Sequence, residues 1–219
     1  MIASRLIWVY HDFAKVQVLT ADKNAQFAIR GILSRNRSLG FSLLPQSSIE
    51  YVTHPEKDPG VLRTAKLLLS PFLRTHPHAL AIMDREGSGC GTSTAEQMEQ
   101  QIEADLLAAG WADRAAALVI NPELDIWVWA DSPHVEAEIG WADQSTNVRA
   151  WLVQKGFLFS AEGKPLRPKE ALEAALRHVH LPRSSALYKS LAEKVSLVRC
   201  ADRAFLKLKT TLQSWFPET

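Results

Sequence analysis

A continuous apolar run in the first half of the chain is the feature that most constrains the fold. Residues 78–83 read His-Ala-Leu-Ala-Ile-Met and are followed directly by Asp84. A strand that is apolar on both faces is typical of a parallel sheet covered by helices on both sides. Parallel strands need long crossover connections, which are usually helical. The neighbouring sequence should therefore alternate between strands and helices.

The neighbouring sequence has this alternation. The content of β-branched residues predicts further strands over 15–20, 49–53 and 115–120. Apolar spacing predicts intervening helices over 24–34, 61–73 and 93–109. Ser93 and Glu96 form a predicted capping box at the start of the third of these helices, and Gly110 is its predicted stop. The turn-rich segment 55–60 is predicted to be a loop.

After residue 121 the pattern becomes helical. Leu124, Trp127, Val128 and Asp131 have the spacing of one helix face, and further helices are predicted over 168–178 and 202–216. We predict an α/β protein with a mostly parallel, Rossmann-like sheet flanked by helices. Residues 1–121 form this core, and residues 122–219 form a helical extension packed on it within the same single domain.

Composition narrows the class of protein. The 219 residues are 47% hydrophobic and carry a formal net charge of +1, which is ordinary globular usage. A generally basic nucleic-acid coat protein is excluded, so any nucleic-acid contact must be local. Residues 1–10 lack the features of a signal peptide, and no stretch reaches the roughly 20 apolar residues of a membrane span. With only Cys90 and Cys200, a disulfide framework is not expected, and we predict a cytoplasmic protein.

Chemistry is expected directly after the apolar strand. Ligands of parallel α/β sheets bind beyond the carboxyl ends of the strands, where Asp84 and Glu86 lie. Their carboxylates suit Mg²⁺ or Mn²⁺. The following Gly87-Ser88-Gly89 lets backbone N–H groups approach a phosphate near a helix N-terminus. The alternative is that both acids cap turns and face solvent.

Two motifs resemble a known family. Residues 81–89, Ala-Ile-Met-Asp-Arg-Glu-Gly-Ser-Gly, and residues 121–131, Asn-Pro-Glu-Leu-Asp-Ile-Trp-Val-Trp-Ala-Asp, resemble the TOPRIM-like small bacterial proteins of the DUF4276 and RloB-related group. Residues 54–60, the helix at 168–178 and Trp215-Phe-Pro217 further resemble a branch associated with methylation-associated antiphage defence systems.

The resemblance assigns roles to individual residues. It implies that Asp84 and Glu86 hold a divalent cation, and that Glu123 and Asp131 match the acids of the helix motif. It also implies a Glu directly after the first strand, where this chain has Leu19-Thr-Ala-Asp22. Asp22 is the candidate substitute, with a shorter and displaced carboxylate. This departure questions catalysis more than it questions the fold.

Each of these acids also has a purely structural interpretation. Glu123 follows Pro122 and could stabilise a helix dipole. Asp131 precedes Ser-Pro and could start a turn. Asp58, in Asp-Pro-Gly, is expected to be a turn residue, although its loop could border the same crevice. Trp127 and Trp129 are expected in the core rather than as stacking platforms for bases.

Other candidates are weaker. Cys90 lies near a helix N-terminus but lacks a nearby His partner, and His178-Val-His180 lacks a second pair of zinc ligands. A locally basic stretch surrounds the linker at 163–168 and could contact nucleic acid or a partner; it comprises Lys164, Arg167, Lys169, Arg177 and Arg183.

The leading hypothesis is a Mg²⁺- or Mn²⁺-dependent phosphodiester hydrolase of a bacterial antiphage defence system. The rival is a catalytically degenerate subunit that senses nucleic acid or binds other defence proteins. A Cys90-based enzyme is the third alternative. The sequence does not distinguish DNA, RNA and nucleotides as substrates, and it does not reveal the oligomeric state.

Overall fold

The computed structural model describes residues 15–42, 46–197 and 200–218. The expectation about a signal peptide in residues 1–10 lies outside these ranges. Four strands form one all-parallel sheet in the order β2-β1-β3-β4; they are β1 (Val16–Thr20), β2 (Ile49–Thr53), β3 (His78–Asp84) and β4 (Ala115–Ile120). The predicted α/β class and all four predicted strands are confirmed.

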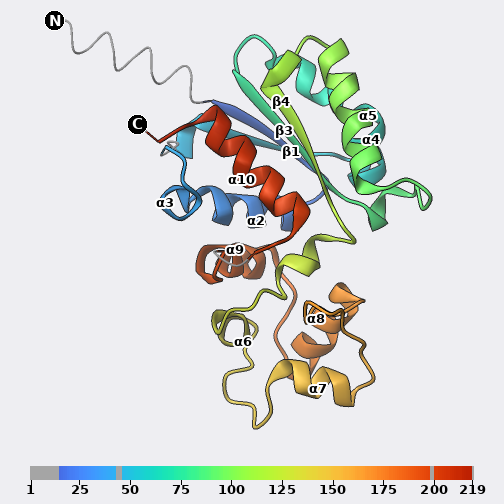
Figure 1. The fold of residues 1–219 in the computed structure, drawn as a ribbon, viewed down its shortest axis with the longest axis vertical. Coiled ribbons are helices and arrows are strands. Elements are labelled where there is room, and N and C mark those ends of the chain that lie inside the picture. Colours follow the sequence, from blue (N-terminus) through green and yellow to red (C-terminus); the bar gives the residue numbers. More distant parts are fainter. Residues whose placement is uncertain (1–14, 43–45, 198–199, 219) are drawn as a thin grey trace, which may run out of the picture.

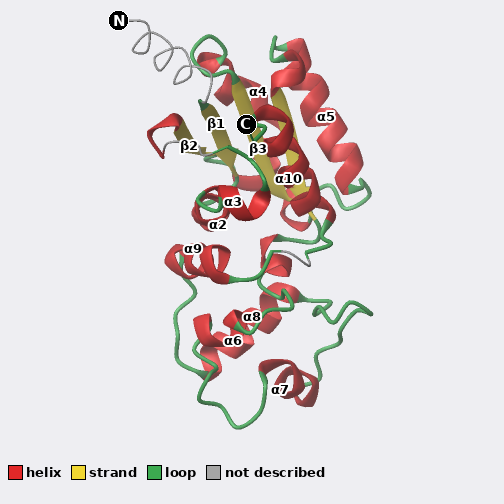
Figure 2. Cartoon of the chain, turned by 60° about the vertical axis from the view of Figure 1, so that its left-hand side comes forward, coloured by secondary structure: helices red, strands yellow, loops and turns green. Residues whose placement is uncertain are grey.

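Helices cover both faces of this sheet (Figures 1 and 2). One face carries α2 (Lys23–Leu33) and α10 (Arg203–Trp215), and the other carries α4 (Lys57–Leu69) and α5 (Ala95–Ala108). The burial of β3 explains the two-sided apolar run. Leu80 and Ile82 pack with α2 and α10, whereas Ala81 and Met83 pack with α4 and α5.

The remaining helices follow β4 in the chain. Three short or medium helices lie beyond the carboxyl ends of β3 and β4 (Figure 1); they are α6 (His134–Glu138), α7 (Val148–Gln154) and α8 (Pro168–His178). We call residues 134–178 the helical lobe. The chain then returns to the core, where α9 (Ser185–Lys194) packs on α2. A four-residue helix, α3 (Asn36–Leu39), follows α2.

Three local predictions were wrong. The expected loop at 55–60 is largely helical, because α4 already begins at Lys57. The capping box of α5 uses Thr94 and Gln97, one residue beyond the predicted pair. The expected helix after residue 121 is only a 3-10 turn, η5 (Leu124–Trp127), which ends before Ser132-Pro133. Gly110 does end its helix as predicted, with φ of +98°.

Polar side chains cover the outer edge of β4. The Glu99 and Glu103 carboxylates on α5 accept hydrogen bonds from the N–H groups of Val119 (2.9 Å) and Ala117 (3.0 Å). Arg203 of α10 donates to Glu99 at 2.8 Å. An exposed strand edge is a template for unwanted pairing, and these contacts close it.

The seven tryptophans include several of the largest core residues. Trp111, Trp129 and Trp141 are fully buried. The Trp129 indole donates to the Pro168 carbonyl at 3.0 Å and the Trp127 indole donates to Asp202 at 2.8 Å. The prediction that Trp127 and Trp129 serve in packing is confirmed.

The contact of α2 with α9 yields a stability test at Gly31. A Cβ at this position would lie 2.7 Å from both the Ala192 Cβ and the Lys189 carbonyl oxygen. We expect Gly31→Ala to lower the free energy of unfolding by about 1–3 kcal/mol, as overpacking does. Gly91→Ala is the control, because that position has open space. Urea unfolding measures both, and equal stabilities would contradict the close packing.

Candidate active site

Acidic side chains follow every strand of the sheet. Asp22 comes after β1, Asp58 lies in the first turn of α4 after β2, and Asp84 is the last residue of β3. Glu123 and Asp125 come after β4. Since the strands are parallel, these acids all lie where the strands end. We call this end of the sheet its carboxyl edge; it is the usual place of ligand binding in such sheets. We call this set of five residues the acidic cluster.

A direct contact joins Asp58 to Asp84. The Asp58 Oδ1 accepts a hydrogen bond from the backbone N–H of Asp84 at 2.7 Å. Gly87 permits this approach, because a Cβ there would lie 2.3 Å from the Asp58 Oδ2. Asp58 therefore lies against the end of β3 that carries Asp84.

Asp84 is held from its other side by the loop after β4. Its Oδ1 accepts a hydrogen bond from the Leu124 N–H at 2.9 Å. Burial raises the pKa of Asp84 well above its usual range, and the carboxylates of Asp58, Asp22 and Asp125 raise it further. Burial, with a contribution from Asp22, likewise raises the pKa of Asp58. Converging carboxylates are the electrostatic setting that a divalent cation relieves.

Asp22 has two roles. Its Oδ1 caps α2 by accepting a hydrogen bond from the Ala25 N–H at 2.8 Å. Its charge also reaches Asp58 and Asp84. The structure therefore brings the predicted substitute for the first-strand Glu to the acidic cluster, with one carboxylate oxygen engaged in a helix cap.

Glu123 connects the cluster to the helical lobe. Its backbone is extended at the N-cap of η5, and its side chain makes no capping hydrogen bond to that turn. Its Oε1 instead accepts a hydrogen bond from the Lys169 N–H, in the first turn of α8, at 3.1 Å. Burial, with Asp125 and Glu86 as further contributors, raises the pKa of Glu123 to about 7. An acid with this pKa can exchange a proton near neutral pH.

Asp125 was not among the predicted site residues. It is fully buried, and its carboxylate contacts the Tyr188 hydroxyl at 2.6 Å and the Arg183 guanidinium at 2.9 Å. A sequence signal was present, because Glu123-Leu-Asp125 repeats the spacing of Asp84-Arg-Glu86 directly beyond the neighbouring strand. Asp125 contributes charge to the cluster, while its oxygens bind Tyr188 and Arg183.

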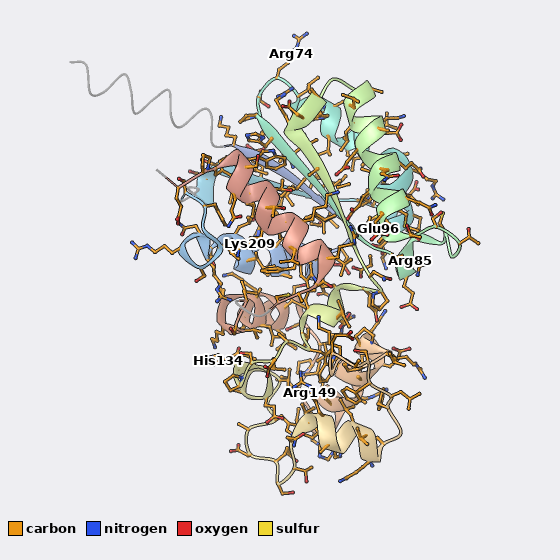
Figure 3. The ribbon with its side chains drawn as sticks, in the orientation of Figure 1. Arg74, Arg85, Glu96, His134, Arg149 and Lys209 are labelled. Atoms are coloured by element: carbon orange, nitrogen blue, oxygen red, sulfur yellow. The ribbon has the colours of Figure 1, made fainter. Side chains whose placement is uncertain are left out.

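The loop after β3 is fixed mainly by its backbone. The N–H groups of Arg85 and Glu86 donate to the carbonyls of Ile120 and Pro122 at 2.8 and 2.9 Å, and the Glu86 side chain is exposed. The Arg85 guanidinium holds the Ser93 and Gly91 carbonyls. Figure 3 places Arg85 and Glu96 beside the carboxyl end of the sheet, where α5 begins.

The predicted phosphate loop has specific internal contacts. The Ser88 N–H donates to the Arg85 carbonyl at 3.2 Å, and the Ser88 hydroxyl accepts from the Cys90 N–H at 3.1 Å. Gly87 makes room for Asp58, and Gly89 has φ of +75°. Phosphate binding by Gly87, Ser88 and Gly89 stays a prediction, with the Ser88 N–H already engaged.

A buried histidine shapes the turn that carries Asp58. The His54 Nδ1 accepts from the Glu56 N–H at 3.1 Å, and its Nε2 lies 2.9 Å from the Thr64 hydroxyl. A Cβ at Gly60 would lie 2.1 Å from the His54 Nδ1. Burial lowers the pKa of His54, which favours the neutral ring that these contacts require. The segment 54–60 thus positions Asp58.

Other candidates lie apart from the cluster. Asp131 is on the exposed turn after η5, and the acids that raise the pKa of Asp84 and Glu123 do not include it. Cys90 is exposed, and both cysteines are free. His178 contacts the rings of Trp141 and Trp151 in the helical lobe, tilted against each of them.

The side chains of the cluster do not by themselves enclose a metal ion. Within the described ranges, no three His, Cys, Asp or Glu side chains stand in a geometry that encloses a metal. Mg²⁺ is commonly bound by one or two carboxylates together with water and substrate phosphate. Asp84 and Asp58 each use the Oδ1 atom for the backbone N–H of another segment, which leaves the Oδ2 atom of each. These two oxygens are the available ligands.

The fold and the site together define a class: an α/β protein with an all-parallel sheet and an acidic cluster at its carboxyl edge. Comparison with protein-family models, with characterised proteins and with solved structures finds no match for this chain. No helix within the described ranges is long and apolar enough to cross a membrane. The geometry of the cluster is therefore the basis for assigning a function.

The charge of the cluster makes a stability prediction. A raised pKa means that the ionised form of Asp84 costs folding free energy above the usual pKa of a carboxyl group and that this cost disappears as pH falls. Asp84→Asn keeps an oxygen for the Leu124 N–H but removes the charge. Without divalent metal at pH 8, we expect this variant to unfold roughly 2–4 °C higher, which is about 1 kcal/mol for a chain of this size. Calorimetry measures the shift.

Asp143→Asn is the matched control, because Asp143 is exposed on a loop of the helical lobe. It should leave the unfolding temperature unchanged. A lower unfolding temperature for Asp84→Asn than for this control would show that the Asp84 charge stabilises the fold.

Proposed function

We propose that this protein is a divalent-metal-dependent phosphodiester hydrolase with a TOPRIM-like, nuclease-type site, acting in bacterial antiphage defence. The observation that supports the proposal is the grouping of Asp22, Asp58 and Asp84; burial raises the pKa of Asp84, and the charges of Asp58 and Asp22 raise it further. The assignment to a defence system follows from the sequence resemblance alone.

The acids divide into two groups by environment. Asp84 and Asp58 would hold Mg²⁺ or Mn²⁺, with Asp22 and the exposed Glu86 nearby. When bound, the ion would polarise the phosphate and lower the pKa of a coordinated water. Glu123 follows the neighbouring strand β4 and has the pKa of a general base.

Residues of the chain can take up the proton of the attacking water and attract the negatively charged substrate. The Glu123 carboxylate would accept a proton from water, the water oxygen would bond to phosphorus, and the bond to the leaving oxygen would break, with that oxygen taking a proton from solvent. Lys57, beside Asp58, and Lys169, beside Glu123, are exposed cations that can attract a phosphodiester. Lys169 belongs to the locally basic stretch, and its N–H at the start of α8 donates to Glu123.

A second candidate function has its own support. Asp22, Asp58, Asp84 and Glu123 each accept a hydrogen bond from a backbone N–H, and the first strand lacks the Glu that the resemblance implies. A catalytically degenerate subunit that binds nucleic acid or defence proteins would retain these acids for structure. This rival predicts no specific binding of divalent metal.

Metal titration separates the two functions. We expect Mn²⁺ and Mg²⁺ to bind the wild-type protein in calorimetry, and Asp84→Asn to weaken this binding at least about tenfold, because it removes a charged ligand. Asp143→Asn should bind as the wild type does. Equal binding by Asp84→Asn, or none by the wild type, would favour the degenerate subunit. Hydrolysis of single- and double-stranded DNA and RNA then identifies the substrate.

The pKa of Glu123 predicts a pH profile. At saturating metal, hydrolysis should rise with pH through a midpoint near 7, because the base must be deprotonated. Glu123→Gln should keep metal binding and lose this dependence together with about 10²–10⁴-fold of the rate. Initial rates between pH 5.5 and 8.5 measure the profile. A wild-type midpoint that persists in Glu123→Gln would assign the proton transfer to another group.

A further inference from the structure

A cavity lies beside α2, between the edge strand β2 and α9. Its volume is about 460 Å³, within the range of small-molecule sites. It is lined by Phe27, Arg30, Ser34, Ile49, Tyr51, Lys189 and Glu193. None of these residues belongs to the acidic cluster.

A cation without a carboxylate partner stands at this cavity. The Arg30 guanidinium lies 4.5 Å from the centre of the Tyr51 ring and 5.3 Å from the centre of the Phe27 ring. Arg30 forms no ion pair with any residue in the described ranges. Aromatic rings hold a guanidinium in place without neutralising it, so the charge stays available to a ligand.

Two orphaned polar atoms occur at the same place. The Arg30 Nε and the Tyr51 hydroxyl are both buried and find no hydrogen-bond partner among the described residues. A buried donor without a partner costs roughly 1–3 kcal/mol, and such atoms are rare in folded proteins. Burial raises the pKa of Tyr51, so its hydroxyl keeps the proton that it can donate.

The other lining groups fit the same ligand. Ile49 and the partly buried Phe27 supply apolar wall for an organic body. The Lys189 ammonium lies at the cavity and pairs with Glu193 at 3.3 Å, and both side chains are exposed. An exposed pair of this kind is weak, so Lys189 can turn to an incoming anion.

We propose that this cavity binds a small organic oxyanion, a phosphate or a carboxylate, held by the Arg30 guanidinium and the Tyr51 hydroxyl. The planar guanidinium presents several N–H donors to such oxygens. One oxyanion bound there neutralises the unpaired charge, and it satisfies both orphaned donors once the Arg30 and Tyr51 side chains turn these buried atoms towards it. The site is independent of the proposed hydrolase function.

Calorimetric titration with phenyl phosphate and with benzoate tests the proposal. The two ligands distinguish binding of a phosphate from binding of a carboxylate. EDTA in the buffer excludes binding through a metal at the acidic cluster, and constant ionic strength excludes general screening. We expect saturable binding of at least one ligand. Arg30→Gln should raise its Kd at least about tenfold, and Tyr51→Phe roughly two- to tenfold, through loss of the donors.

Arg37→Gln is the control, since it removes the same charge from an exposed site on α3 outside the cavity. It should bind as the wild type does. The proposal is overturned if neither ligand binds the wild type, or if Arg30→Gln and Arg37→Gln change the Kd equally. Tyr51→Phe keeps the aromatic ring, so its Kd remains informative if Arg30→Gln fails to fold.

Discussion

The carboxyl edge of the sheet depends on hydrogen bonds from backbone N–H groups to carboxylates. Asp58, after β2, binds the N–H of Asp84, and Asp84 binds the N–H of Leu124 after β4. Glu123 then binds the N–H of Lys169 at the start of α8. Charged acceptors form stronger hydrogen bonds than neutral ones. These three bonds connect successive loops into one continuous edge that ends on the helical lobe.

Hydrogen bonds from backbone N–H groups to carboxylates also cover the outer edge of the sheet, at strand β4. Glu99 and Glu103 of α5 satisfy the outer N–H groups of β4, and cations of α10 then neutralise them. The two places differ in their charge balance. At β4, Arg203 and Lys207 compensate the acids, and the pKa of Glu99 is lowered. At the carboxyl edge Arg183 pairs with Asp125, but no ion pair among the described residues includes Asp84 or Glu123, and the pKa of each of these two acids is raised.

The sheet was predictable from the sequence because burial on two faces leaves a local signature. The apolar run at 78–83 and the β-branched runs at 16–20 and 49–53 each specify a strand without reference to the rest of the chain. Position after a strand also predicted Asp84. The turn at 124–127 was not predictable, because the spacing of Leu124, Trp127 and Val128 suits a 3-10 turn as well as an α-helix.

Contacts between distant segments explain what the sequence did not show. The environment of Asp125 depends on Arg183 and Tyr188, about sixty residues away. Glu123 caps a helix that begins 45 residues later, so its own neighbours suggested the wrong helix. Likewise, Gly87 looked like part of a phosphate loop, but its lack of a side chain is required by Asp58. None of these pairings has a periodicity that a single sequence displays.

Structural and chemical roles are compatible at the cluster because a carboxylate has two oxygens. At Asp58 and Asp84 one oxygen fixes the backbone, which holds the residue in a single orientation, and the other is available to a ligand. The structural bond therefore preorganises the site, and preorganised groups need no rearrangement when charge develops. The backbone bonds alone do not require ionised acids, since the amide oxygen of Asn would also accept them. A purely structural role therefore gives no physical reason for bringing these uncompensated carboxylates together.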